Sequence, residues 1–264
     1  MIVDVHTHIF PPRMIAARAE LAAADAGFTE LYGDPHARMA TAFDLLASMD
    51  AAGIDVSVAS GFWWQSAVHA AEHRAYIFEV AAASNGRILP FVPLAPDEPI
   101  QAAAGATGLG EVRVTAAGPW TAKAAANGLP LLVHCSEEVG HAYAGKAGGL
   151  RPGALWGLVS AHAGIRVIAA HWGGGFPFYA LMPEVRAVLG SGRLVFDTAA
   201  SSLLYDPRVF EVATNLVGEG LVLWGSDFPL RAQADDRART EAAIRDLGLR
   251  AAIMGDNAAR LLHL

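Results

Sequence analysis

Short apolar runs recur along the whole 264-residue chain, and each is followed by a longer Ala-rich segment whose apolar residues have helical spacing. This alternation is typical of β–α units in a parallel sheet. Most runs are apolar at successive positions, as expected when helices cover the sheet. The eight runs span residues 2–8, 56–61, 88–94, 108–114, 131–135, 167–171, 194–198 and 221–226. Eight such units close a (β/α)8 TIM barrel, so we predict an α/β fold with a single domain over residues 1–264.

The segments between the runs predict the helices. Residues 37–52 and 67–83 carry apolar side chains three and four positions apart, and Gly53 is placed to end the first of these helices. Residues 97–107 predict a short or imperfect helix, and residues 140–152 form a glycine-rich loop. An open doubly wound sheet of this size usually has fewer strands, which favours the barrel.

The composition excludes several classes of protein. The mean hydropathy of +0.33 is compatible with a membrane protein, but the longest uncharged stretch, residues 167–183, contains a histidine, three glycines and two prolines, so it predicts no spanning helix. The chain opens without a signal-peptide pattern, which predicts a cytoplasmic location. A net charge of −7 without basic blocks argues against nucleic acid and membrane surfaces as partners. A single cysteine, Cys135, excludes an internal disulfide and a multi-cysteine zinc site.

Histidines mark the ends of several predicted strands. His6 and His8 are two residues apart on the first strand, so their side chains point to the same side. His134 ends the fifth strand, His171 ends the sixth and Asp227 follows the eighth. In a barrel, these residues converge on the C-terminal face, where active sites of this fold are built.

Three imidazoles and one carboxylate, with room for water, form the ligand set of a catalytic zinc site. The same donors suit Mn, Fe or Ni, so we expect a divalent metal ion with zinc as the first candidate. The other six histidines are expected to be solvated or locally packed: His36, His69, His73, His141, His162 and His263.

Four motifs give the sequence a family resemblance: DVHTH at 4–8, LVHCSE at 132–137, AAHWGGG at 169–175 and WGSDFP at 224–229. With the closing NAARLL at 257–262, they resemble the amidohydrolase superfamily, in the branch that groups metal-dependent hydrolases with aminocarboxymuconate-semialdehyde decarboxylase. The resemblance implies that His6, His8, His134 and Asp227 are metal ligands. It also implies that His171 positions or deprotonates a metal-bound water, and that Asp227 shuttles a proton.

The number of metal ions depends on the fourth strand. Many binuclear relatives use a carboxylated lysine there, but the lysines of this chain, Lys123 and Lys146, are expected in a helix and a loop. Glu111, in GLGEVRV, resembles the glutamate that bridges two metals in other relatives. We expect one ion, with Glu111 as a ligand only if the site is binuclear. The alternative for Glu111 is an ion pair with Arg113, which shares its side of the strand.

Several residues are candidates to contact a substrate. Arg113 is suited to hold a carboxylate through paired hydrogen bonds. Trp63 and Trp172 belong to a group of aromatic residues that follow the strands and either wall an apolar pocket or simply cap the barrel. Tyr143 lies in the glycine-rich loop that is long enough to fold over the site. Asp197, at the end of the seventh strand, and Asp4 are candidates to orient a ligand histidine.

The leading functional prediction is a metal-dependent hydrolase that uses an activated water on an amide, ester or lactone. The alternative is a metal-dependent non-oxidative decarboxylase of an unsaturated or aromatic acid. A barrel that has lost catalysis and serves as a binding module is a third interpretation, against which the intact set of ligands speaks. Either enzyme would act on a small molecule. The resemblance also implies a homodimer, although no exposed apolar stripe in the sequence indicates one.

Overall fold

Eight parallel strands form one sheet in the order β1 to β8, each hydrogen-bonded to the next along the chain. The computed structural model describes the backbone of residues 1–264 and every side chain except those of Pro119, Trp120 and Lys123. The strands are β1 (Val3–His8), β2 (Val56–Ser60), β3 (Ile88–Val92), β4 (Gly108–Val112), β5 (Pro130–Val133), β6 (Arg166–Ala169), β7 (Leu194–Asp197) and β8 (Val222–Leu223). The predicted strands are all present, which confirms the (β/α)8 barrel.

The barrel closes where β8 returns to β1. The backbone N–H of Val5 donates to the carbonyl of Trp224 (3.0 Å), that of Asp227 to His6 (2.9 Å) and that of His8 to Phe228 (2.7 Å). β8 itself has only two residues, so the bonds beyond its end complete the closure. They also bring the two predicted ligands of β1 beside Asp227.

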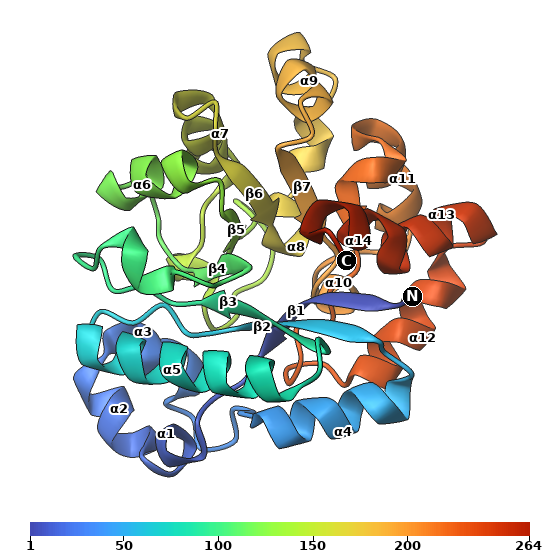
Figure 1. Cartoon of the computed structure of the whole chain (residues 1–264). Coiled ribbons are helices and arrows are strands. Elements are labelled where there is room, and N and C mark those ends of the chain that lie inside the picture. Colours follow the sequence, from blue (N-terminus) through green and yellow to red (C-terminus); the bar gives the residue numbers. More distant parts are fainter.

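Most helices surround the strands, and two short ones, just after β6 and β7, lie near the middle of the view (Figure 1). They are α1 (Pro12–Ala16), α2 (Arg18–Ala24), α3 (Ala26–Tyr32), α4 (Ala42–Ala52), α5 (Ala67–Ala83), α6 (Pro119–Asn127), α7 (Pro152–Ala161), α8 (Ala170–Gly173), α9 (Pro183–Gly190), α10 (Ser201–Leu204), α11 (Val209–Val217), α12 (Gln233–Ala243), α13 (Leu247–Ala251) and α14 (Asn257–Leu262). Shorter turns of helix are η1 (Ile100–Ala103), η2 (Lys146–Gly148), η3 (Phe176–Tyr179), η4 (Glu219–Leu221) and η5 (Ala252–Asp256).

The local sequence explains where these helices begin and end. α5 has the predicted bounds, whereas α4 begins at Ala42 because Thr41 and Asp44 form a capping box. Gly53 ends α4 in the left-handed conformation (φ 63°), as predicted. The imperfect helix predicted over residues 97–107 is the single turn η1.

The segment after β1 is less regular than the other units. It folds into α1, α2 and α3, which were not predicted from the sequence. An aromatic cluster joins these helices to the barrel: Phe28 stacks on Trp64 (5.1 Å between ring centroids) and contacts the rings of Phe10 and Phe62 edge-on. The cluster places Tyr32, the last residue of α3, beside the mouth of the barrel.

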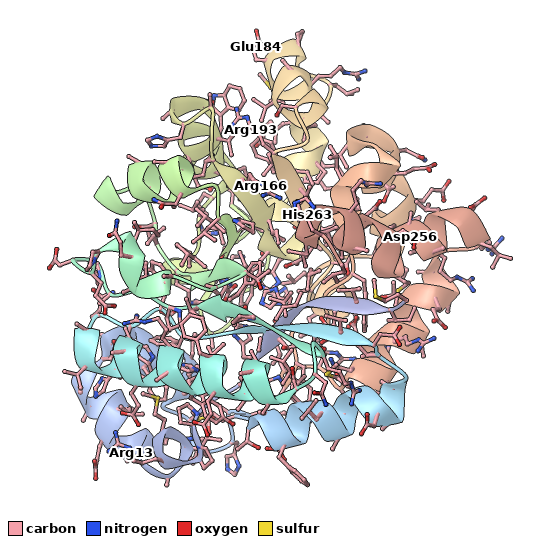
Figure 2. The ribbon with its side chains drawn as sticks, in the orientation of Figure 1. Arg13, Arg166, Glu184, Arg193, Asp256 and His263 are labelled. Carbon is pink, nitrogen blue, oxygen red and sulfur yellow. The ribbon has the colours of Figure 1, made fainter. Side chains whose placement is uncertain are left out.

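The opposite face, where the strands begin, is held by arginines. Figure 2 labels Arg166, the first residue of β6, and Arg193, which directly precedes β7. Their guanidinium groups donate to the carbonyl oxygens of Leu261 (2.9 Å) and Val159 (2.6 Å). This face therefore carries structural contacts, while the predicted ligands lie at the other end. Among the described residues, no helix combines the length and apolar character needed to cross a membrane.

Candidate active site

A cavity of about 480 Å³ opens at the C-terminal ends of the strands. His8, Glu111, His134, His171 and Asp227 line it, so the barrel brings together ligand candidates from five parts of the chain. His6 is fully buried directly behind His8, with 3.1 Å between their Nε2 atoms. The structure thus shows the predicted convergence on this face.

His6, His8 and Asp227 form a set of donors with the spacing of ligands on one ion. The two Nε2 atoms lie 3.1 Å apart, and Oδ1 of Asp227 lies 3.7 Å from that of His6 and 3.4 Å from that of His8. A circle through three points with these separations has a radius of about 2.0 Å, which matches a metal–nitrogen bond of ~2.0–2.1 Å. A divalent ion therefore fits this donor set.

Two carboxylates support this set from other strands. Oδ2 of Asp197, at the end of β7, lies 2.8 Å from Nδ1 of His6 and so fixes the ring with Nε2 toward the cavity. Burial by itself lowers the pKa of His6, but the carboxylates of Asp197, Asp227 and Glu111 outweigh it and raise that pKa to about 10. The negative charge around the ring is what a bound cation would neutralise.

Glu111 lies at the centre of the histidine cluster. One oxygen is 2.8 Å from Nδ1 of His134 and 3.7 Å from Nε2 of His6; the other is 3.8 Å from Nε2 of His8. Burial favours the protonated form, but the surrounding histidines and Arg113 hold the pKa of Glu111 well below its usual range. Glu111 thus faces the same donors as Asp227, and it also forms a set of potential metal donors with His6 and His171.

The contacts of His134 differ from those of His6 and His8. It belongs to neither donor set found among the described residues. Its Nδ1 contacts Glu111, and its Nε2 lies 3.2 Å from the carbonyl oxygen of Gly145. Burial and the nearby Arg113 lower the pKa of His134 to about 4, so the ring is neutral and has one N–H for two acceptors. Further polar groups lie beside the ring: Oγ of Ser136 is 3.4 Å from Nε2, and Nε2 of His171 is 3.2 Å from Nδ1.

The cluster carries more negative than positive charge. Asp197, Glu111 and Asp227 are carboxylates, and Arg113 is the cation beside them, 3.5 Å from Glu111. With His6 protonated, as its raised pKa implies, the group has a net charge of −1; with His6 neutral, as a metal ligand must be, the net charge is −2. Buried charge of this kind is costly without a partner, and one divalent cation would balance it.

The turns that carry the ligands hold residues in unusual conformations. His171 (φ 56°) and Asp227 (φ 64°) have the left-handed backbone conformation, which L-residues adopt rarely. The glycine run after His171 serves close packing, as predicted, because a Cβ on Gly174 would clash with the carbonyl oxygen of Ser136. The loops after β5 and β6 are therefore in backbone contact beside the cluster.

Arg113 and Tyr143, two of the residues predicted to contact a substrate, line the cavity. The guanidinium of Arg113 is 11% exposed and donates to the carbonyl oxygen of Gly145 (3.0 Å). The ion pair with Glu111 that was considered for Arg113 is also present at 3.5 Å. Lys146 donates to the carbonyls of Val139 and His141 (both 2.8 Å) at the outer end of this loop. The side chain of Lys123 lies outside the described residues.

Three expectations need correction. Trp63 and Trp172 are buried in the main hydrophobic core and do not line the cavity; the indole of Trp172 donates to Ser201 (2.7 Å). Their side chains point into the layer between strands and helices, so these aromatic residues pack the barrel. Asp4 orients no imidazole: it accepts from the backbone of Ser226 (3.0 Å) and the side chain of Gln233 (2.8 Å), and so fastens β1 to β8.

Other residues in or near the cavity could not be identified from a sequence pattern. Tyr32 and Glu30 reach the cavity from α3, whose position depends on the aromatic cluster. The chain also contains a carboxylate, Glu137, that accepts hydrogen bonds from the hydroxyls of Tyr143 (2.8 Å) and Tyr205 (3.0 Å). Glu137 lies within the LVHCSE motif, three residues after His134, and this proximity is the one signal that could have indicated it.

Solved structures with this fold include several decarboxylases. The 5-carboxyvanillate decarboxylase of Sphingomonas paucimobilis superposes with a TM-score of 0.75 at 16% identity, covering 100% of this chain and 99% of that one. The 2,6-dihydroxybenzoate decarboxylase of Rhizobium gives 0.74 at 16%, covering 99% and 98%. The 5-carboxyvanillate decarboxylase of Novosphingobium aromaticivorans, complexed with manganese and 4-hydroxy-3-methoxy-5-nitrobenzoic acid, gives 0.77 at 14%, covering 100% and 96%.

Comparison of the sequence with curated proteins finds no match. The family model described as Amidohydrolase matches residues 3–264. The four motifs, the barrel and the cluster of histidines and carboxylates at its C-terminal face agree with that match. The chain therefore belongs to the amidohydrolase family.

Proposed function

We propose that this protein is a metal-dependent non-oxidative decarboxylase of a small aromatic carboxylic acid. This was the alternative to the hydrolase in the sequence analysis. The observation that carries it is the cavity itself, in which the guanidinium of Arg113 and the donors His8 and Asp227 line the same space. The decarboxylases of similar fold, some of them solved with a bound aromatic ligand, support the same choice.

His6, His8 and Asp227 would hold one divalent ion, with Glu111 adjacent. When bound, the ion would stabilise the negative charge that develops on the substrate as its carbon–carbon bond breaks. Manganese in a structure of similar fold makes Mn²⁺ the first ion to test beside the predicted zinc. The role of His134 as a ligand stays a prediction, because its contacts to Glu111 and Gly145 assign it equally well to holding those groups.

The side chains have separate tasks in this reaction, which replaces a carboxylate by a proton. Arg113 would orient the carboxylate of the substrate. When CO2 leaves, the electron pair of the broken bond stays on the ring carbon, which then takes up a proton. Burial raises the pKa of Asp227, but the hydrogen bond to His8 and the nearby His6 and His171 lower it overall, so Asp227 is ionised before substrate binds. Asp227 would take up a proton from the carboxyl group of the substrate or from water and deliver it to that carbon; its lowered pKa makes it a weak base but, once protonated, a strong proton donor.

His171 is the second group suited to move a proton. Its Nδ1 lies 3.1 Å from the carbonyl oxygen of Ala199. A carbonyl only accepts hydrogen bonds, so this contact places the ring proton on Nδ1. Nε2 is then free of that proton and faces the cavity beside Glu111.

The test is product chemistry on protein loaded with Mn²⁺ or Zn²⁺. We expect CO2 release from members of a panel that includes 5-carboxyvanillate and 2,6-dihydroxybenzoate. His171→Asn should keep the metal and lose turnover, whereas His162→Asn, which changes a histidine that contacts Thr121 instead (3.0 Å), should behave as the parent protein. Hydrolysis of esters, amides or lactones without CO2 release from any acid would reject the decarboxylase and favour the hydrolase.

A further inference from the structure

Two walls of the cavity come from loops that are distant in the sequence. The β5 wall consists of His141, Tyr143 and Ala144, in the loop after β5. The β7 wall consists of Ala200, Leu203 and Leu204, after β7. Between them, the walls provide both polar and apolar contacts to anything that enters the cavity.

Glu137 connects the two walls. Its Oε2 accepts from the hydroxyl of Tyr143, in the β5 wall, at 2.8 Å. Its Oε1 accepts from the hydroxyl of Tyr205, directly after the β7 wall, at 3.0 Å. Each carboxylate oxygen thus accepts a hydrogen bond from a different tyrosine. Such bonds to a charged acceptor are stronger than those between neutral groups.

The backbone around Glu137 is itself fixed. It lies three residues after His134 in the motif that enters the site, and its carbonyl oxygen accepts from Arg151. Burial, together with the charge of Glu137, raises the pKa of both tyrosines well above the usual value. Both phenols therefore stay protonated and act as donors over the whole pH range in which an enzyme works.

We propose that Glu137 is a specificity-determining positioning residue, which joins the two walls through Tyr143 and Tyr205 and so sets the space available to the ring of the substrate. The inference rests on the proposed function for the identity of that substrate. Glu137 does not line the cavity, so its effect reaches the substrate through the walls. Loss of one of the two hydrogen bonds of Glu137 should therefore weaken substrate binding, seen in KM, more than it slows the chemical step, seen in kcat.

The first measurement requires no substrate. Hydrogen exchange would be followed at two amides of the β5 loop. That of Gly145 donates to the carboxylate of Glu30 in α3 (3.0 Å), and that of Lys146 donates to the carbonyl oxygen of Tyr143 (3.2 Å). Tyr205→Phe, a change on the other wall, should speed exchange at both amides by ~10-fold, as expected for loss of one bond to a charged acceptor. The matched control is Tyr179→Phe, a tyrosine 48% exposed in η3 and outside the cavity, which should leave them unchanged.

The second measurement is turnover of the best acid in the panel. Glu137→Gln removes the charge and replaces one acceptor oxygen by an amide donor, so it and Tyr205→Phe should each raise KM by ~10-fold and change kcat less than twofold. Rates of exchange equal to those of the parent protein in both variants would overturn the connection between the walls. Faster exchange with an unchanged KM would overturn the positioning role.

The two proposals fail separately. If the parent protein releases CO2 from no acid, the proposed function is wrong, and the exchange rates at Gly145 and Lys146 still accept or reject the connection through Glu137. If CO2 is released but the variants match Tyr179→Phe in both measurements, the function stands and the role of Glu137 is rejected.

Discussion

Asp236 is a buried carboxyl whose removal should make the protein more stable at high pH. It lies in α12, is 3% exposed and accepts a hydrogen bond from the indole of Trp224 (3.0 Å). Burial raises its pKa to about 7, and the nearby Asp4 adds to the effect, whereas the bond from Trp224 opposes it. Asp236→Asn keeps an oxygen that can accept from Trp224 and removes the titration.

The sign and size follow from proton linkage. In the unfolded chain the carboxyl has the ordinary aspartate pKa of 3.8, so the folded state binds the proton more tightly. The stability that this proton provides is complete below pH ~4 and is lost as the pH rises to ~7. At 1.36 kcal/mol per pKa unit the total loss is about 4 kcal/mol, of which about 2–3 kcal/mol falls between pH 5 and pH 8.

The assay is urea unfolding of chelator-treated protein at pH 5 and pH 8. The advantage of Asp236→Asn over the parent protein should grow by about 2–3 kcal/mol between these two pH values. Asp235→Asn, which changes an exposed carboxylate on the same helix, should show no such growth. An advantage that is equal at both pH values would refute the assignment of a raised pKa to Asp236.

Three further outcomes follow from the geometry. His8→Ala should lower the metal content measured by plasma emission spectrometry, because it removes a donor on the cavity side. Gly174→Ala should lower the free energy of urea unfolding by about 2–4 kcal/mol, because φ is +63° and the new Cβ meets the carbonyl of Ser136. The control is Gly157→Ala, where a Cβ meets nothing within 4 Å; it should raise that free energy by up to ~1 kcal/mol. Arg113→Lys should raise KM for the acid by ~10-fold in steady-state assays, because lysine cannot make the paired hydrogen bonds.

The barrel could be predicted because its signal is local. Each strand is a run of successive apolar residues, and each candidate ligand stands at a fixed place relative to such a run. His6, His8, His171 and Asp227 therefore needed no knowledge of tertiary contacts beyond the convergence of strand ends. Even the contact between Asp197 and His6, across 191 residues, follows from the position of Asp197 at the end of its strand.

The cavity walls could not be predicted in the same way. Tyr32 lines the cavity only because an aromatic cluster packs α3 against the barrel, and such packing is not visible in periodicity. Trp63 and Trp172 follow strands, as wall residues would, but the direction of their side chains depends on turns with unusual backbone angles, such as φ 57° at Trp172. The residues of a loop indicate that the chain turns there, but they do not indicate which side chains then face the cavity.

The closure of the barrel by Asp4 has a consequence for how the protein is made. His6 and His8 leave the ribosome first, but Asp227 joins them only when the last strand has been synthesised. Asp4 fastens β1 to Ser226 (2.6 Å) and Gln233 (2.8 Å), and these contacts too require the late part of the chain. The nascent chain therefore lacks the three-donor set until Asp227 has been synthesised, and it lacks the contacts that hold β1 beside that residue until Gln233 has followed.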